Sequence, residues 1–198
     1  KEEGISPREV VDRYHPRNVE MMRQLGISFD LFTETDTENH WAVTQEMFLE
    51  HIKNEVVYRD TMPQLYCVDC KKWLADRYVE GVCPHCGYVG ARGDQCDNCG
   101  RTYDAIELIR PRCKYCGGSN IEVRETEHFF LDLGKLNDPL LEWVTDGSKA
   151  HWRGNVYNYT VSRLSSHELR GRPMTRDMSW GVTIPRPGYE DKRIYVWY

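Results

Sequence analysis

In the first part of the chain apolar residues recur every three or four positions, a spacing that predicts helices. Ser6-Pro7-Arg8-Glu9 is a helix start, with a serine cap, a proline in the first turn and a glutamate three residues after the cap. We expect Pro16 to interrupt this helix, because proline lacks the N–H that the helix needs. A second helix should end at Gly26, and residues 27–33 alternate as a short strand would.

A third helix is expected next, with Thr35 or Asp36 as its cap. It places Trp41, Phe48 and Ile52 on one face, which therefore faces a core. Residues 56–58 are β-branched and aromatic, so they should be extended. Helical and extended segments thus precede the cysteine-rich part of the chain.

The last third of the chain gives a weaker pattern. Residues 127–133 predict a buried strand, and residues 135–150 a mostly helical segment. Residues 151–170 are weakly periodic, with an apolar stripe. Residues 175–187 are rich in proline and glycine and predict a loop. Residues 194–198 have strand composition and stop without a turn signal, so we expect this chain to be a fragment of a longer protein.

Eight cysteines, all of them in C-x-x-C pairs, lie within fifty residues: Cys67, Cys70, Cys83, Cys86, Cys96, Cys99, Cys113 and Cys116. We expect neither disulfides, since no leader peptide or membrane-spanning run is seen, nor a thioredoxin-like redox pair, which would be a single C-x-x-C at a helix start. Two such pairs can enclose one Zn²⁺ in a tetrahedral shell of four thiolates. Four pairs predict two zinc ions, and because no coordination position is left for water, the predicted role is structural.

Spacing alone leaves three ways to combine the four pairs. They could join sequentially, interleave, or nest with the second pair joined to the third and the first to the fourth. Loop closure favours the shortest gap, between Cys86 and Cys96, by only tenths of a kcal/mol, and this margin does not decide. Glycine follows three of the pairs, at Gly87, Gly100 and Gly117, where a positive φ lets backbone N–H groups point at sulfur.

Charge and composition narrow the class of protein. The chain has 198 residues and a net charge of −5, which argues against a surface devoted to nucleic acid. Six tryptophans and twelve tyrosines are enough for a globular core. Basic residues gather in the cysteine-rich part, and we interpret them as a solvated face balanced by nearby acids. The expected location is cytoplasmic, with no membrane contact.

Four strings in the sequence resemble methionyl-tRNA synthetases, which are class I aminoacyl-tRNA synthetases. DRYVEGVCPHCG (residues 76–87), ARGDQCDNCG (91–100) and ETEHFFLDL (125–133) are similar to the zinc-knuckle connective peptide of that family and its flank. TRDMSWGVTIP (175–185), followed by YVWY, is similar to the return from the insertion into the catalytic fold. The last motif is shared with the leucine, isoleucine and valine enzymes.

The resemblance implies an α/β fold, part of a Rossmann-like class I catalytic domain with an inserted zinc-knuckle domain. Residues 1–60 would belong to the first half of the nucleotide-binding fold. Residues 61–170 would form the connective-peptide domain, with its knuckles in residues 65–123 and a helical remainder. Residues 171–198 would return to the catalytic fold as the first strand of its second half.

The family joins methionine to tRNA with ATP as the energy source. Its two ATP-binding signatures, similar to H-I-G-H and K-M-S-K-S, are absent here, so the chain alone is expected to be inactive. The implied partners are tRNA, methionine and the remainder of the synthetase catalytic domain. Two structural Zn²⁺ ions and ATP, as a substrate of the parent enzyme, are the implied cofactors.

The resemblance also assigns roles to single residues. Sequence alone favours Trp197 as a core residue on an alternating strand, but the resemblance assigns it to an aromatic wall of the methionine pocket, where a thioether packs well on a ring. Arg176 would lie near the amino-acid and adenylate site, with an ion pair to Asp177 as the alternative. Family members lose cysteines as nested sets, which favours one ion on Cys83, Cys86, Cys96 and Cys99, and another on Cys67, Cys70, Cys113 and Cys116.

Two other functions remain possible at this stage. A free-standing zinc-ribbon module that binds nucleic acid or protein should have complete terminal elements, whereas residues 1–4 look like the end of a helix and residues 194–198 like an unfinished strand. An editing domain that hydrolyses mischarged tRNA is disfavoured, because the insertion is short and filled by knuckles.

Overall fold

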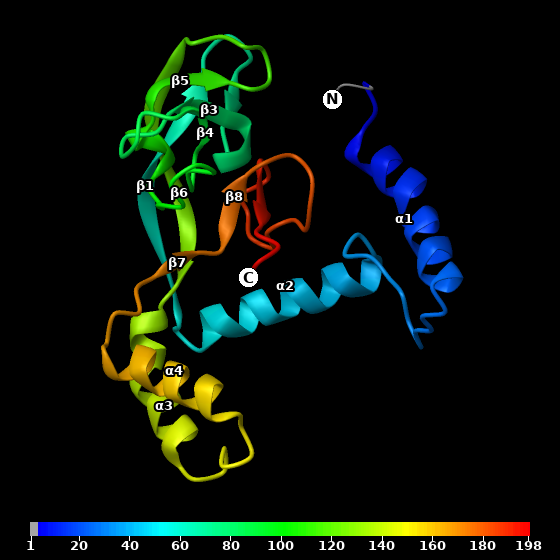
Figure 1. Ribbon diagram of the computed structural model, residues 1–198, viewed down its shortest axis with the longest axis vertical. Helices are drawn as coiled ribbons and strands as arrows, with labels where there is room; N and C mark the ends of the chain where they lie inside the picture. The colour runs from blue at the N-terminus through cyan, green and yellow to red at the C-terminus, as the bar shows by residue number, and fades with distance from the viewer. Residues whose placement is uncertain (1–3) are drawn as a thin grey trace.

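A long antiparallel ribbon forms the axis of the molecule. The computed structural model describes residues 4–198, so the helix end expected at residues 1–4 lies largely outside the described part. Strands β1 (Val57–Cys67) and β6 (Ile121–Leu131) pair in one register from Val57↔Leu131 to Cys67↔Ile121. They are the central strands of a four-stranded sheet in the order β2-β1-β6-β7. Figure 1 shows the ribbon joining a compact strand region at one end to a helical pair at the other.

The strand region contains the four cysteine pairs. Strand β2 (Lys72–Trp73) extends the ribbon, while β3 (Val79–Val82), β4 (Val89–Arg92) and β5 (Ile109–Cys113) form a three-stranded sheet in the order β4-β3-β5. Two short 3-10 turns, η1 (Asp76–Tyr78) and η2 (Ala105–Glu107), connect them. A small core forms from these buried residues: Leu65, Leu74, Val79, Ala91, Tyr103, Leu108 and four of the cysteines.

At the opposite end, α3 (Leu133–Thr145) packs against α4 (Gly154–Ser165). The buried Asn137 side chain of α3 donates a hydrogen bond to the Leu164 carbonyl oxygen at 3.0 Å, which ties the two helices together. The helical prediction for residues 135–150 is thus confirmed over most of its length, and the weakly periodic segment after it contains α4. Strand β7 (Arg172–Pro173) then returns to the ribbon beside β6.

The N-terminal segment differs from two of its predictions. The capping box is confirmed, because Glu9 N donates to Ser6 Oγ at 3.2 Å and Ser6 N to Glu9 Oε2 at 2.7 Å. However, one helix, α1 (Pro7–Gln24), runs through Pro16. The predicted break was wrong, because the proline φ suits a helix and only one hydrogen bond is lost. The strand predicted at residues 27–33 was wrong too: that segment pairs with no described strand and remains irregular.

Helix α2 (Glu38–Lys53) begins one residue later than the nearer of its two predicted caps, Asp36, would place it. Thr37 is the cap, and its Oγ1 accepts a hydrogen bond from His40 N at 3.2 Å. Phe48 of this helix is fully buried and meets Phe129 edge-on, with 5.2 Å between ring centroids. The second core of the molecule forms around this pair, from β6, α2 and the C-terminal segment.

The C-terminal segment forms a short hairpin that packs on β6. Strands β8 (Thr175–Asp177) and β9 (Lys192–Ile194) pair antiparallel, so the predicted loop over residues 175–187 begins with a strand. The strand predicted over residues 194–198 was wrong apart from Ile194: β9 ends there, and Tyr198 N bonds the Tyr195 carbonyl oxygen in a turn. The fold is mixed α/β, and all strand pairs of residues 4–198 are antiparallel rather than parallel as in a nucleotide-binding sheet. Strand β1 crosses the domain boundary expected at residue 60.

Candidate metal centres and the adjoining cavity

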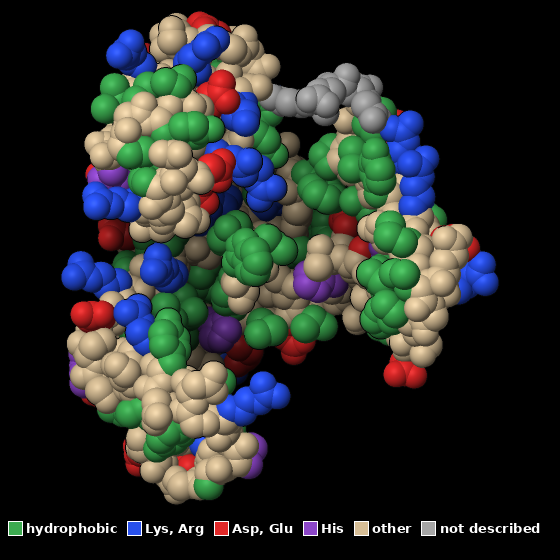
Figure 2. Space-filling model, viewed as in Figure 1, with side chains coloured by type: hydrophobic (Ala, Val, Ile, Leu, Met, Phe, Trp, Pro, Cys, Tyr) green, Lys and Arg blue, Asp and Glu red, His purple; other side chains and the backbone are tan. Residues whose placement is uncertain are grey.

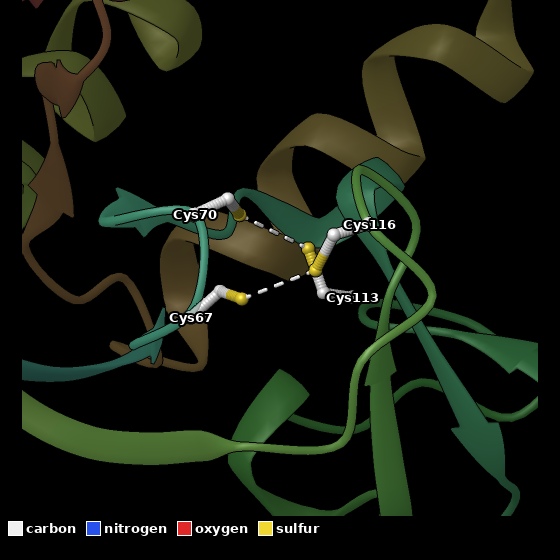
Figure 3. A group of neighbouring side chains, drawn as sticks. All are labelled: Cys67, Cys70, Cys113 and Cys116. Atoms are coloured by element: carbon white, nitrogen blue, oxygen red, sulfur yellow. Dashed lines mark hydrogen bonds between the residues drawn. The ribbon is translucent and has the colours of Figure 1, made fainter.

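The first and fourth cysteine pairs meet where β1, β2, β5 and β6 converge. Cys67 ends β1 and Cys70 lies in the turn before β2, whereas Cys113 ends β5 and Cys116 lies in the turn before β6. The Sγ atoms of Cys67 and Cys116 are 3.6 Å apart, as are those of Cys70 and Cys113. Figure 3 shows the two pairs pointing toward one another from separate segments. We call these four residues the outer tetrad.

The second and third pairs form a similar group, the inner tetrad. Cys83 and Cys86 follow β3, and Cys96 and Cys99 follow β4. The Sγ atoms are 4.0 Å apart for Cys83 and Cys99, and 3.6 Å for Cys86 and Cys96. In each tetrad all four sulfurs lie within 4.8 Å of one another. A tetrahedron with Zn–S bonds of 2.3 Å has sulfurs about 3.8 Å apart, so both tetrads could hold zinc.

Backbone geometry turns each knuckle toward its sulfurs. Gly87, Gly100 and Gly117 all have φ between 71° and 74°, as predicted, and each N–H bonds the carbonyl oxygen of the first cysteine in its pair. Backbone N–H groups also approach sulfur, with His85 N 3.4 Å from Cys83 Sγ and Tyr115 N 3.3 Å from Cys113 Sγ. In the first knuckle the corresponding position is Lys71, which adopts a φ of 50° without being glycine.

The cysteines compete for negative charge. The backbone N–H of Tyr88 lowers the pKa of the Cys86 thiol to about 6. The backbone N–H of Arg101 likewise favours the Cys99 thiolate, but burial and the neighbouring sulfurs outweigh it and raise the pKa of Cys99 to about 11. Four neighbouring thiolates therefore repel one another. A divalent metal bound among them would supply the compensating positive charge.

A cavity of about 490 Å³ adjoins the metal-binding region. It lies between the first half of α2, turn η1 and the C-terminal segment, and its lining is largely apolar, with Asp36 and Arg77 as charged exceptions. In Figure 2, hydrophobic side chains gather in the hollow between the strand region and the helix α1. The aromatic and sulfur-containing lining residues are Trp41, Met47, Tyr78, Met178, Trp180, Tyr195 and Tyr198.

The two predicted substrate residues lie beside this cavity. The Trp197 side chain is 82% exposed and lies outside the lining, between Val196 and Tyr198, which are part of it. Arg176 stacks on Tyr195, with its guanidinium carbon 4.1 Å from the ring centroid, and donates to the Thr175 carbonyl oxygen at 3.1 Å. The alternative of an Arg176–Asp177 ion pair is wrong, because Asp177 pairs with Lys192 and His128 instead.

Sequence reasoning missed several cavity residues. Trp41 packs against the second core, as its helix face predicted, but it also lines the cavity, as does the neighbouring His40. Trp180 was noted only as part of a loop. The available signal was one tryptophan at the start of α2, Trp41, and another in the proline- and glycine-rich segment 175–187, Trp180. Periodicity cannot show that these two segments meet.

The whole chain, residues 1–198, matches the family described as "tRNA synthetases class I (M)". A match along every residue shows that this chain belongs to the class I tRNA synthetases of the methionine type. It is 50% identical to the methionine–tRNA ligase of Thermomicrobium roseum over 196 residues, which is 99% of this chain and 33% of that protein. It is also 50% identical to the enzyme of Dehalococcoides mccartyi strain BAV1 over 198 residues, 100% of this chain and 35% of that protein.

Solved structures agree on the fold. Mycobacterium tuberculosis methionyl-tRNA synthetase in complex with methionyl-adenylate superposes with a TM-score of 0.63 at 20% identity, covering 98% of this chain and 33% of that one. The chain thus spans about a third of the relatives that it matches. A free-standing zinc ribbon is disfavoured, because the match extends over both helical ends as well as the knuckles. Among residues 4–198, no helix is both long and apolar enough to cross a membrane.

Proposed function

We propose that this chain is part of a methionine–tRNA ligase, the enzyme that uses ATP to attach methionine to tRNA in the cytoplasm. The observation that carries the proposal is the identity of about half of all residues, along the whole chain, with curated methionine–tRNA ligases. The segment contributes two structural zinc sites and one wall of the substrate site. Residues 1–60 and 171–198 belong to the catalytic fold in this proposal, and residues 61–170 to the connective peptide.

The methionine site is assigned to the C-terminal segment and its cavity. Trp197 supplies an aromatic surface for the thioether, and Arg176 a permanent cation for the anionic groups of the substrate. The exposure of Trp197 supports this role, since a core tryptophan would be covered by this chain itself. The guanidinium of Arg176 is held by Tyr195, a cavity residue, and its direction is therefore fixed.

The test uses the longer protein that contains this chain. We expect it to catalyse methionine-dependent ATP–pyrophosphate exchange, and the 198-residue chain alone to show none. Trp197→Ala should raise the KM for methionine about tenfold. Trp143→Ala should not, because Trp143, another exposed tryptophan, lies in α3 at the opposite end of the ribbon from the strand region and has no cavity residue as a chain neighbour. Exchange by the short chain, or an unchanged KM in the Trp197 variant, would contradict the assignment.

The zinc assignment has a separate test. Cys83→Ser combined with Cys86→Ser should lower the zinc content from two ions to one and make Cys96 and Cys99 reactive to alkylation. The outer tetrad should stay protected. Exposure of Cys67 and Cys70 instead would mean that the pairs join sequentially. The matched control changes Cys113 and Cys116 to serine, which should release the other ion and leave the inner tetrad protected.

The remainder of the catalytic domain is the proposed partner of α1. Within the described residues α1 buries no side chain, and apolar residues on it and on the following segment are exposed. Relatives are about three times as long, so chain outside this segment is available to cover them. Amide hydrogen exchange of α1 should be fast in the 198-residue chain and slow in the longer protein. Equal rates would show that α1 stays uncovered.

A further inference from the structure

A cluster of buried polar side chains joins the β8–β9 hairpin to β6. It consists of Thr126 and His128 from β6, Thr175 and Asp177 from β8, and Lys192 from β9, all buried. Lys192 Nζ donates to Thr126 Oγ1 at 2.6 Å and to Asp177 Oδ1 at 2.5 Å. Thr126 Oγ1 donates in turn to Asp177 Oδ2 at 2.9 Å. Three strands are therefore tied together at one ammonium group.

His128 and Thr175 form the second half of the cluster. Phe129 N donates to Thr175 Oγ1 at 3.1 Å, and His128 Nδ1 lies 3.0 Å from the same oxygen. His128 Nε2 lies 3.1 Å from Asp177 Oδ2 but lacks the angles of a hydrogen bond. The His128 side chain is 0% exposed and that of Asp177 2%. Lys192 is thus the carboxylate's one well-bonded cationic partner among the described residues.

A buried polar cluster is not the most stable way to join these strands. Buried ion pairs lose hydration, and apolar residues of similar volume often stabilise a protein more. Apolar packing is used just beside it, where Phe129, Met174 and Ile194 belong to the second core. Hydrogen bonds do what apolar contacts cannot: they fix one position of the hairpin, since each donor needs its own acceptor.

The hairpin positioned in this way carries one wall of the cavity. Met178 directly follows Asp177, and Ile194 and Tyr195 follow Lys192 by two and three residues; all three line the cavity. Arg176 lies between the cluster residues Thr175 and Asp177 in the strand, and its side chain stacks on Tyr195 instead of entering the cluster. A shift of the cluster therefore moves the cavity wall and the Arg176 guanidinium together.

We propose that Lys192, acting through Asp177 and His128, is a positioning residue that sets this wall for methionine binding. The proposal rests on the proposed function. Without the ammonium group, Asp177 keeps only the poorly aligned His128 nearby and is left as a buried charge short of compensation. The hairpin then moves to let water reach the carboxylate. When both charges are removed, nothing requires hydration and the hairpin keeps its place.

The test compares Lys192→Met, Asp177→Asn and the double variant in the longer protein, with Lys53→Met, an exposed lysine, as the control. We expect each single variant to raise the KM for methionine in ATP–pyrophosphate exchange about ten- to a hundredfold, with kcat changed far less. The double variant should recover most of the loss, and the control should match the wild type. All are measured well below their melting temperatures and at equal zinc content, so that unfolding does not contribute.

Hydrogen exchange of the Ile194 and Tyr195 amides supplies a readout independent of activity. These amides bond the Val182 and Met174 carbonyl oxygens, so they should exchange faster in the single variants and normally in the double variant. A wild-type protein without methionine-dependent exchange would refute the proposed function and leave this readout to decide the positioning role. Unchanged KM and amide exchange in the single variants, or a double variant as impaired as both singles added together, would overturn the proposal.

Discussion

At the scale of single residues, Lys71 is the exception among the four knuckles. It occupies, with a φ of 50°, the position that glycine fills in the other three. A side chain in this left-handed region is strained by roughly 1–2 kcal/mol, because Cβ approaches the following carbonyl oxygen.

We therefore predict that Lys71→Gly raises the free energy of unfolding of the zinc-loaded chain by about 1 kcal/mol. The neighbouring change Lys72→Gly, in β2, should lower it by about 0.5–1 kcal/mol, because glycine weakens a strand. Chemical denaturation of both variants in the presence of zinc checks the pair. A loss of stability in the Lys71 variant would mean that its side chain makes contacts that outweigh the strain.

His167 provides a residue-scale prediction on pH. The Ser165 carbonyl oxygen, 3.1 Å from Nδ1, and the Asp138 carboxylate, 2.9 Å from Nε2, raise the pKa of His167 above its ordinary value. The stabilisation from these contacts is complete below the unfolded-state pKa of about 6.5 and is lost as the pH rises through the folded-state pKa. Asp138→Asn should lower the titration midpoint of His167 measured by NMR. Glu168→Gln should leave it unchanged.

At the scale of elements, the sequence predicted what is local and missed what depends on distant partners. The capping box at Ser6 and the glycine turns after the cysteines formed as predicted, because a few neighbouring residues determine them. The predicted strand over residues 27–33 did not form, since a strand needs a partner that alternation cannot reveal. The cysteine sets could be proposed from spacing and resemblance together. The buried pairing of Lys192 with Asp177 could not, because fifteen residues separate them and no spacing rule joins the 175–185 string to Lys192.

Phe48 shows how one side chain fixes an element. It is 0% exposed and packs against Phe129 of β6, which makes it the fully buried contact between α2 and the ribbon. Phe48→Ala should lower the free energy of unfolding by about 3–5 kcal/mol, through lost apolar contact and the cavity left behind. Leu49→Ala, at a partly exposed neighbouring position, should change it by less than about 1 kcal/mol. Similar effects of the two changes would place the core elsewhere.

At the scale of the whole molecule, the two ends of the ribbon rely on different forces. The strand region encloses a small core around the cysteines, whereas α3 and α4 pack without any cysteine. Structural zinc contributes an apparent 10–16 kcal/mol near neutral pH, comparable with or larger than the roughly 5–15 kcal/mol that stabilises a whole domain. The strand region should therefore depend on zinc for its stability, whereas the α3–α4 pair should not.

Chelation should unfold residues 65–123 first, while the α3–α4 pair keeps its amide protection. Hydrogen exchange followed by mass spectrometry, with and without a chelator, measures both ends in one experiment. Return of excess zinc should restore protection of the strand region. An unchanged melting temperature and proteolysis pattern after complete metal removal would contradict a structural role for the ions.

The nesting of the tetrads also implies an order of assembly. Cys86 and Cys96 are ten residues apart in the chain, while Cys70 and Cys113 are 43 apart. Closing the longer loop in an unfolded chain costs roughly 1 kcal/mol more, and closure of the inner loop shortens the path that remains for the outer one. The inner site is thus able to capture its ion while the rest of the chain is still unfolded. The outer site, which links the end of β1 to the end of β5, can close once the inner one is complete, so we expect metal loading to proceed from the centre of the sequence outward.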